Sequence, residues 1–192
     1  MRAFKSYFGV HSLTRVLDVG GTYYNWSLLP DLPRPVIVNL SLPDRQDRRE
    51  DIIWIVADGR ALLFADKTFD IVYSSSVIEH LETLENQIWF AKECRRVGKA
   101  YYIQTPNRLF PFEPHFLTPL FQYLPKKLQR KLLRYTVRYL LDQVPLYLFE
   151  KMWSEIRLLD AIELQRLFPD AELWRETFFG LAKSLIAVRR LL

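Results

Sequence analysis

The stretch that decides the fold of this chain is Val16-Leu17-Asp18-Val19-Gly20-Gly21-Thr22. It is an apolar run that ends in an acid and a glycine turn, which predicts a buried strand followed by bare backbone. In open α/β sheets, ligands bind at the carboxyl ends of the strands, where this carboxylate and these peptide groups are expected. The motif therefore predicts a ligand crevice whose geometry suits a cofactor that carries a nucleoside.

Two further strand ends repeat this arrangement. Asn39 comes 21 residues after Asp18, close to the spacing at which such folds contact a ribose, and Asp58-Gly59 follows the next apolar run. Three polar strand ends in register predict one shared crevice. The alternative is that Asp18 and Asp58 only cap turns.

Predicted strands and helices alternate along the chain. Strands are expected at residues 15–19, 36–40, 52–56, 69–74 and 100–105, and a hairpin at 171–178 and 181–188 through Gly180. Helices are expected at 22–29, 77–97, 126–141 and 158–167, with Gly98 as a left-handed cap and 41–51 as a loop. The predicted fold class is α/β: a Rossmann-like, doubly wound, mostly parallel seven-stranded sheet with an antiparallel C-terminal hairpin and a helical, aromatic insertion after the fifth strand.

Composition limits the possible classes of protein. The 192 residues, 49% of them hydrophobic and 26% charged, fit a single domain over 1–192 and argue against disorder. No uncharged apolar stretch approaches the roughly 18 residues of a membrane span, and the N-terminus does not resemble a signal peptide. The single cysteine, Cys94, favours a reducing, cytoplasmic location and is expected to be an ordinary packed thiol.

The combination of VLDVGGT, ADGRALLFADKTFDIVYSSSVIEHL and LFPDAELWRETFFGLAKSLIAVRR closely resembles the class I S-adenosylmethionine (SAM)-dependent methyltransferases. It is most similar to the small-molecule branch that includes the ubiquinone and menaquinone biosynthesis enzymes (methyltransferase type 11). The resemblance covers the chain from about Arg15 onward, except the insertion at 110–159. It implies SAM as cofactor and assigns these cofactor-binding positions: Asp18, Gly20, Gly21, Asn39, Asp58, Gly59, Ser74 and Ser75.

Two positions depart from the family pattern. Thr22, Tyr23 and Tyr24 stand where the family usually has more glycine, and Asn39 stands where it usually has an acid. An asparagine cannot provide a charge-assisted hydrogen bond to the ribose, so SAM affinity is expected to fall by about 1 kcal/mol.

Histidines are the candidates for moving a proton during methyl transfer. His80 follows Glu79 behind the fourth strand, and His115 lies in the aromatic loop of the insertion. Either could act as general base, or shape the pocket without chemistry, whereas His11 is expected at the surface. The three histidines lack the spacing of metal ligands, so no metal site is expected.

The insertion could form a lid over the substrate, lie on an anionic membrane, or only pack against the sheet. Residues 126–138 hold six basic residues and no acid, and this basic face is expected to stay outside the core. The predicted location is therefore cytoplasmic, with a possible peripheral membrane contact through 126–138.

The sequence predicts SAM-dependent methyl transfer to a small-molecule or lipid-linked acceptor, at oxygen or carbon. The alternatives are a non-catalytic partner or regulatory subunit with the SAM fold and, less favoured, an RNA methyltransferase. DNA is not an expected partner, because Ser74-Ser75-Ser76 replaces the Asn/Asp-Pro-Pro-aromatic motif of DNA amino-methylation and no Pro-Cys nucleophile is present.

Overall fold

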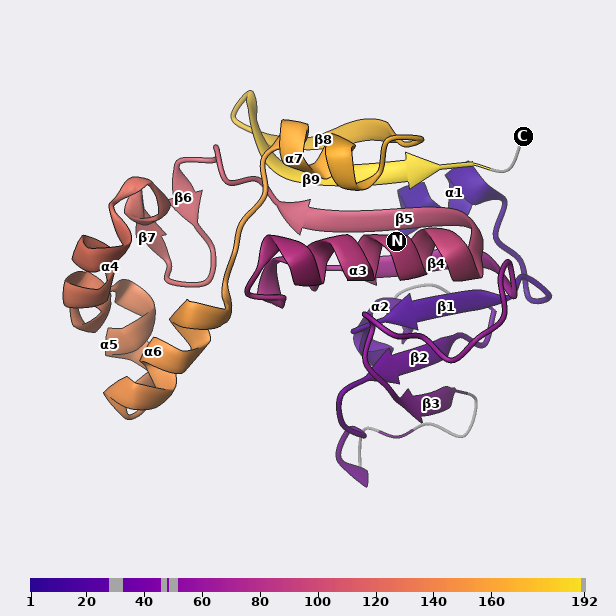
Figure 1. The fold of residues 1–192 in the computed structure, drawn as a ribbon, viewed down its shortest axis with the longest axis horizontal. Helices are drawn as coiled ribbons and strands as arrows, with labels where there is room; N and C mark the ends of the chain where they lie inside the picture. The colour runs from indigo at the N-terminus through magenta and orange to yellow at the C-terminus, as the bar shows by residue number, and fades with distance from the viewer. Residues whose placement is uncertain (28–32, 46–47, 49–51, 191–192) are drawn as a thin grey trace.

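The computed structural model describes residues 1–27, 33–45, 48 and 52–190. A seven-stranded sheet with the order β3-β2-β1-β4-β5-β9-β8 forms its centre (Figure 1). The five strands from β3 to β5 are parallel, and β9 is antiparallel to both β5 and β8. The predicted fold class is therefore confirmed. The strands are β1 (Val16–Val19), β2 (Val36–Asn39), β3 (Ile53–Val56), β4 (Phe69–Ser75), β5 (Gly98–Pro106), β8 (Glu172–Phe178) and β9 (Leu181–Arg189).

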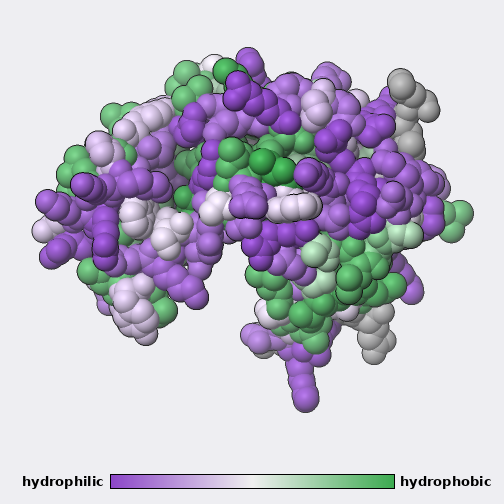
Figure 2. Space-filling view, in the orientation of Figure 1, coloured by the Kyte–Doolittle hydropathy of each residue, from purple (hydrophilic) through white to green (hydrophobic). Residues whose placement is uncertain are grey.

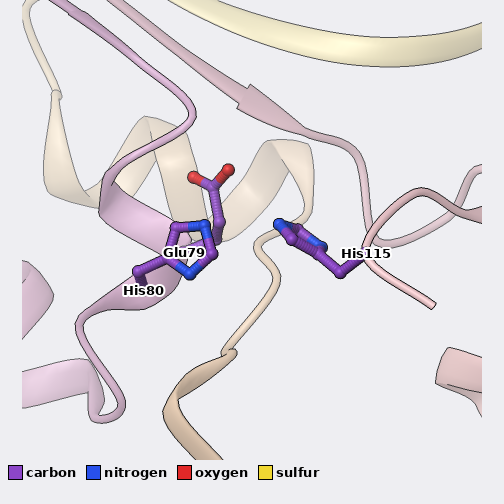
Figure 3. Close-up of side chains that lie close together, drawn as sticks. All are labelled: Glu79, His80 and His115. Carbon is purple, nitrogen blue, oxygen red and sulfur yellow. The ribbon is translucent and has the colours of Figure 1, made fainter. Parts of the chain in front are cut away.

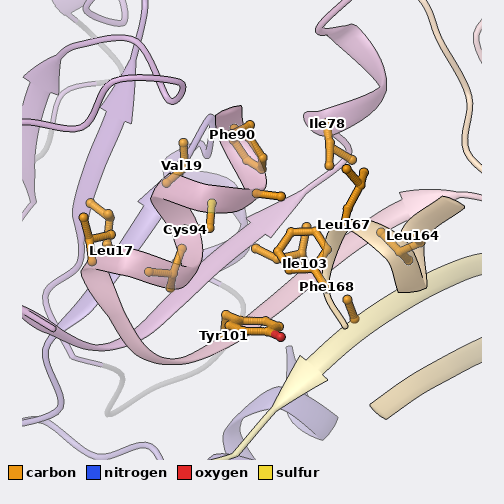
Figure 4. Close-up of a cluster of buried hydrophobic side chains, with 14 of the residues drawn as sticks. Leu17, Val19, Ile78, Phe90, Cys94, Tyr101, Ile103, Leu164, Leu167 and Phe168 are labelled. Carbon is orange, nitrogen blue, oxygen red and sulfur yellow. The ribbon is translucent and has the colours of Figure 1, made fainter. Parts of the chain in front are cut away.

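Helices cover both faces of this sheet, as a doubly wound fold requires. On one face, α3 (Leu84–Val97) and α7 (Ala161–Leu167) bury the larger core, in which Phe90 packs against β1 (Figure 4). On the other face, α1 (Arg2–Phe8) and α2 (Tyr23–Ser27) bury Phe4 and Trp26 against the strands. The helix α1 was not predicted. Residues 28–29 of the helix expected at 22–29, and parts of the loop expected at 41–51, lie outside the described residues.

A continuous helix was predicted for residues 77–97, but the chain after β4 forms two separate segments. A 3-10 turn, η2 (Ile78–His80), is followed by a break at which Glu82 has a φ of 58°, and α3 begins only after Thr83, whose hydroxyl caps it. Gly98 was also predicted wrongly. It has an extended conformation (φ −97°, ψ 142°) and is the first residue of β5, so the chain passes from helix to strand without a left-handed cap.

The insertion between β5 and α7 projects from one end of the sheet (Figure 1), and its visible surface shows both hydrophilic and hydrophobic residues (Figure 2). It has a hydrophobic core of its own, formed by Phe116, Phe121, Leu133, Phe149 and Ile156. Its elements are β6 (Phe112–Glu113), β7 (Thr118–Pro119), η3 (Phe121–Tyr123), α4 (Lys126–Leu132), η4 (Leu133–Tyr135), α5 (Val137–Asp142) and α6 (Leu146–Glu155).

The single amphipathic helix predicted at 126–141 is broken at Thr136. The buried Thr136 hydroxyl donates to the carbonyl of Leu133 and accepts from the amide of Tyr139, which ends one helical segment and caps the next. Before this break, the buried positions are Gln129 and Leu133, four residues apart, while Leu128 and Tyr135 of the predicted apolar face are exposed, so the buried face differs from the predicted one. The prediction that the basic face stays outside the core is confirmed, because all six basic side chains between 126 and 138 are exposed.

Candidate functional site

The glycine turn after β1 is held by close contacts that a side chain would disrupt. Gly20 has a φ of 77°, and its amide donates to the carbonyl of Val38 at 2.7 Å. A Cβ at Gly20 would lie 2.5 Å from Val77, and a Cβ at Gly21 would lie 1.8 Å from the carboxylate of Asp18. Both glycines are therefore needed to bring the backbone turn against its neighbours.

The carboxylate of Asp18 is fully buried behind this turn. Its Oδ2 accepts a 2.6 Å hydrogen bond from the indole nitrogen of Trp26, while Oδ1 has no hydrogen-bond partner among the described residues. Burial raises the pKa of Asp18 to about 7. Asp18 therefore anchors α2 to the end of β1. The contact with Trp26 was not predicted, because an indole eight residues away gives no motif.

The ends of β2 and β3 lie beside the glycine turn. The side-chain amide of Asn39 donates to the carbonyl of Gly21 at 2.7 Å, and this leaves its side-chain oxygen available as an acceptor. Asp58 is bound on both oxygens by the guanidinium of Arg60, whose hydrogen bond lowers the pKa of Asp58. Gly59 packs against Val19 and Phe90.

The serines at the end of β4 divide into one structural and two cavity-lining residues. Ser74 is buried and donates to the carbonyl of Val19 at 2.9 Å. Ser75 and Ser76 both donate to the side-chain oxygen of Gln104 on β5, at 2.8 and 3.1 Å. Gln104 is a site residue that the sequence did not reveal, because only strand pairing brings it opposite the serines.

Two cavities open along this edge of the sheet. One, of about 860 Å³, is lined by Gly21, Asn39 and Trp54 together with residues of α2. The other, of about 570 Å³, is lined by Ser75, Ser76 and Gln104 and extends between the insertion and β8 and β9. Its aromatic walls include Tyr73, Tyr102, Phe110 and Phe112.

The two candidate bases, His80 and His115, are brought together although they lie far apart in the sequence. Their ring centroids are 4.9 Å apart, and Glu79 lies beside them (Figure 3). His80 is exposed at the surface, but the protein around its ring partly desolvates it, and this desolvation together with the neighbouring His115 lowers the pKa of His80. Burial also opposes protonation of His115, but the hydrogen bond and the charge of Glu113 outweigh it and raise the pKa of His115.

The donor set at the glycine turn fits SAM in part. The tight turn exposes backbone at Gly20 and Gly21, and Asn39 offers an acceptor where a ribose would lie. Asp18 does not offer a free carboxylate to a ligand, because it is buried against Trp26, and Asp58 must share its oxygens with Arg60. The backbone, Asn39 and a partly engaged Asp58 therefore remain for the cofactor.

Comparison with known proteins gives one family match and a set of similar proteins. Residues 36–100 match the model of a methyltransferase domain family. An uncharacterised protein of Mycobacterium tuberculosis is 32% identical over 73 residues, which are 38% of this chain and 24% of that protein. The chain thus matches about a quarter of the length of its curated relatives.

Solved structures share the fold over nearly the whole chain. A chain of the complex between the Haloferax volcanii Trm112 methyltransferase activator and a methyltransferase has a TM-score of 0.62 at 14% identity, covering 97% of this chain and 86% of that one. The PH0226 protein of Pyrococcus horikoshii has a TM-score of 0.61 at 19% identity, covering 97% of this chain and 85% of that one. A SAM-dependent methyltransferase of Methanosarcina mazei has a TM-score of 0.56 at 17% identity, covering 95% of each chain.

The strand order and the family match agree with one another. The chain has the Rossmann-like fold that solved SAM-dependent methyltransferases also have, and about a third of it, residues 36–100, matches the methyltransferase domain family. No helix in the described part of the chain is long and apolar enough to cross a membrane.

Proposed function

We propose that this chain binds SAM at the carboxyl edge of its sheet and transfers the methyl group to oxygen or carbon of a small-molecule or lipid-linked acceptor. The observation that carries the proposal is the 570 Å³ cavity beside Ser75 and Ser76. It begins where β4 ends, at the same edge of the sheet as the glycine turn after β1, and it is large enough for a small organic acceptor.

In this proposal, the chain's own residues bind the cofactor and orient it toward the acceptor. SAM supplies an electrophilic methyl group on a sulfonium. The exposed backbone of the turn at Gly20 and Gly21 would lie against the cofactor, and the Asn39 side-chain oxygen would accept from a ribose hydroxyl. Asp58 would accept from the adenine amino group if Arg60 released one of its oxygens.

The acceptor cavity has the chemistry of a site for a partly apolar molecule. Its aromatic walls favour a flat or apolar body, while Glu176 and Lys183 from the hairpin provide charges of both signs. A nucleophilic oxygen or acidic carbon must lose its proton during transfer. His80 and His115 are the histidines that could take that proton. Neither lines the cavity itself, but Pro114, the neighbour of His115, does, so the loop that carries His115 borders the cavity.

The proposal is tested first by calorimetric titration with SAM and with its demethylated product. Both should bind, and Asp58→Ala should weaken binding by roughly 1 to 3 kcal/mol, the cost of an unpaired donor. Absence of detectable binding at millimolar ligand would contradict the proposal.

Gly20→Ala provides a matched pair with Gly180→Ala. Both glycines have a φ of 77°, but a Cβ at Gly20 meets Val77 while a Cβ at Gly180 has nothing within 4 Å among the described atoms. Gly20→Ala should therefore abolish SAM binding, whereas Gly180→Ala should preserve it at a similar backbone strain. Equal SAM binding by the two variants would show that the glycine turn is not part of the cofactor site.

A second candidate function is a non-catalytic partner or regulatory subunit. The observation in its favour is the double hydrogen bond from Arg60 to Asp58, which competes with the adenine contact. Retained SAM binding without turnover on quinol, phenol and lipid-linked acceptors would favour this second function.

The lipid-linked alternative has support of its own in the exposed basic face at 126–138. We propose that this face, in a cytoplasmic protein of the ubiquinone-like branch, reaches an anionic membrane surface that holds the acceptor. Turnover that rises when the acceptor is presented in anionic vesicles, compared with neutral vesicles, would support this location. Equal turnover with both kinds of vesicle would favour a water-soluble acceptor.

A further inference from the structure

Three side chains with metal-binding atoms meet at the boundary between the sheet and the insertion. One ligand atom from each of Glu79, His80 and His115 lies within 4.8 Å of the other two. Glu79 and His80 belong to the turn after β4, and His115 belongs to the loop between β6 and β7 (Figure 3). The spacing of these residues in the sequence predicted no metal site, because the fold alone brings His115 to the pair.

The carboxylate of Glu79 lacks a full set of partners in this cluster. Glu79 is 0% exposed, its Oε2 accepts from the hydroxyl of Thr105 at 3.0 Å, and its Oε1 has no hydrogen-bond partner among the described residues. A buried carboxylate oxygen without a partner is costly, so a cation or a donor that reached Oε1 would be stabilised there. Figure 3 shows this carboxylate beside the two imidazole rings.

His115 is held in the orientation that a metal ligand requires. Its Nδ1 lies 2.7 Å from Oε1 of Glu113, and the other oxygen of Glu113 accepts from the amide of Phe116 at 2.6 Å. A carboxylate that accepts from Nδ1 fixes the tautomer in which Nε2 carries the free lone pair. Glu113 is itself 1% exposed, so this support is rigid.

We propose that Glu79, His80 and His115 bind one divalent transition-metal ion of the zinc type. Two imidazole nitrogens and one carboxylate oxygen suit Zn²⁺ and its first-row neighbours, whereas Mg²⁺ and Ca²⁺ prefer oxygen ligands throughout. Zinc–ligand bonds of about 2.0 to 2.2 Å require ligand atoms no more than about 4 Å apart. The exposed ring of His80 must therefore move inward by about an ångström on binding.

With three protein ligands, the ion keeps an open coordination position. Resting on the proposed function, this position would receive an acceptor oxygen, lower its pKa and orient it for transfer. In that arrangement the two histidines act as ligands and not as bases.

The test is calorimetric titration of the tag-free, chelator-treated chain with Zn²⁺, together with the visible absorption of its Co²⁺ form. We expect one equivalent of Zn²⁺ to bind with micromolar or tighter affinity. The absorption spectrum of the Co²⁺ form should indicate that nitrogen atoms coordinate the ion. His80→Ala and His115→Ala should each weaken binding at least 100-fold. His11→Ala is the matched control, because His11 lies in an exposed turn away from the cluster, and it should bind as the wild type does.

Glu113→Gln separates positioning from ligation. It removes the carboxylate that orients His115 but leaves all three ligands, so Zn²⁺ affinity should fall about 10- to 100-fold. Because His80 is exposed, His80→Ala should fold even if the variants at buried positions do not.

Failure of Zn²⁺ to bind at 100 micromolar, or unchanged binding in both histidine variants, would overturn the metal site. Titration with SAM on the same samples keeps the two proposals apart. Retained SAM binding without Zn²⁺ binding would overturn only the metal site, and the reverse result would overturn only the proposed function.

Discussion

The sheet region and the insertion at 110–159 bury their side chains in different ways. The sheet region has two extended cores, one on each face, built from strands whose neighbours are set by hydrogen-bonded register. The insertion has one small core, with five buried side chains supplied by short, broken helices and a loop. The candidate metal cluster joins the two regions, because it takes Glu79 and His80 from one and His115 from the other. Chemistry at this site therefore depends on how firmly the smaller region is held against the larger one.

The largest effect is expected from Phe90→Ala in the sheet region. Phe90 is fully buried between α3 and the strands, so its loss should reduce the free energy of unfolding by about 3 to 5 kcal/mol. Chemical denaturation followed by far-ultraviolet circular dichroism measures this change. A loss below about 1 kcal/mol would show that the core can rearrange around the cavity.

Phe149→Ala is the matched change in the insertion. Phe149 is 1% exposed and packs against Phe116 and Tyr139. We expect a loss of about 3 kcal/mol that is confined to the insertion, because its core does not depend on the sheet cores. Hydrogen exchange should accelerate in residues 112–155 while β1, β4 and β5 stay protected. Equal acceleration in the strands would mean that the two regions unfold as one unit.

The buried Asp18 gives the sheet region a pH dependence of known sign. Its pKa of about 7 in the folded chain exceeds the value of about 4 in the unfolded chain, so the folded state binds more protons between these values. Its contribution to stability is complete below about pH 4 and is lost as the pH rises through 7.

Asp18→Asn tests this dependence, since an asparagine oxygen can still accept from Trp26. Between pH 5 and 8 the wild type should lose on the order of 2 to 3 kcal/mol more stability than the variant. Thermal melts of both proteins across this range measure the difference. Parallel curves would show that the carboxylate stays protonated or finds a partner.

The smallest effect is expected on the basic face of the insertion. The test is one variant with four substitutions: Lys127→Gln, Lys131→Gln, Arg134→Gln and Arg138→Gln. All four side chains are exposed, and the ion pair of Arg138 with Asp142 lies at the surface. Such pairs contribute about 0 to 1 kcal/mol, so the melting temperature should change little. Binding to anionic vesicles, measured by cosedimentation, should fall if the face contacts membranes. A large loss of stability would instead show that these side chains are packed.

The phase of the helices in the insertion could not be read from the sequence. The pattern at 126–141 predicted an apolar face with Leu128 and Tyr135, but both are exposed, because the insertion's core takes up Gln129 and Leu133 from these turns instead. The same limit applies to Gly98, where the pairing of β5 with β4 extends the strand through a residue that resembles a helix cap.

By itself, the sequence determined the parallel sheet, the terminal hairpin and the glycine turn. These features depend on local patterns: apolar runs of strand length, a glycine pair after β1 and Gly180 between two strands. Only the tertiary structure decided that Trp26 binds Asp18, that Arg60 holds Asp58, and that His115 meets Glu79 and His80. The physical reason is that side-chain contacts, whether local as between Asp58 and Arg60 or distant as between His80 and His115, follow from how turns and elements pack. Such packing leaves no periodic trace in the residues that it brings together.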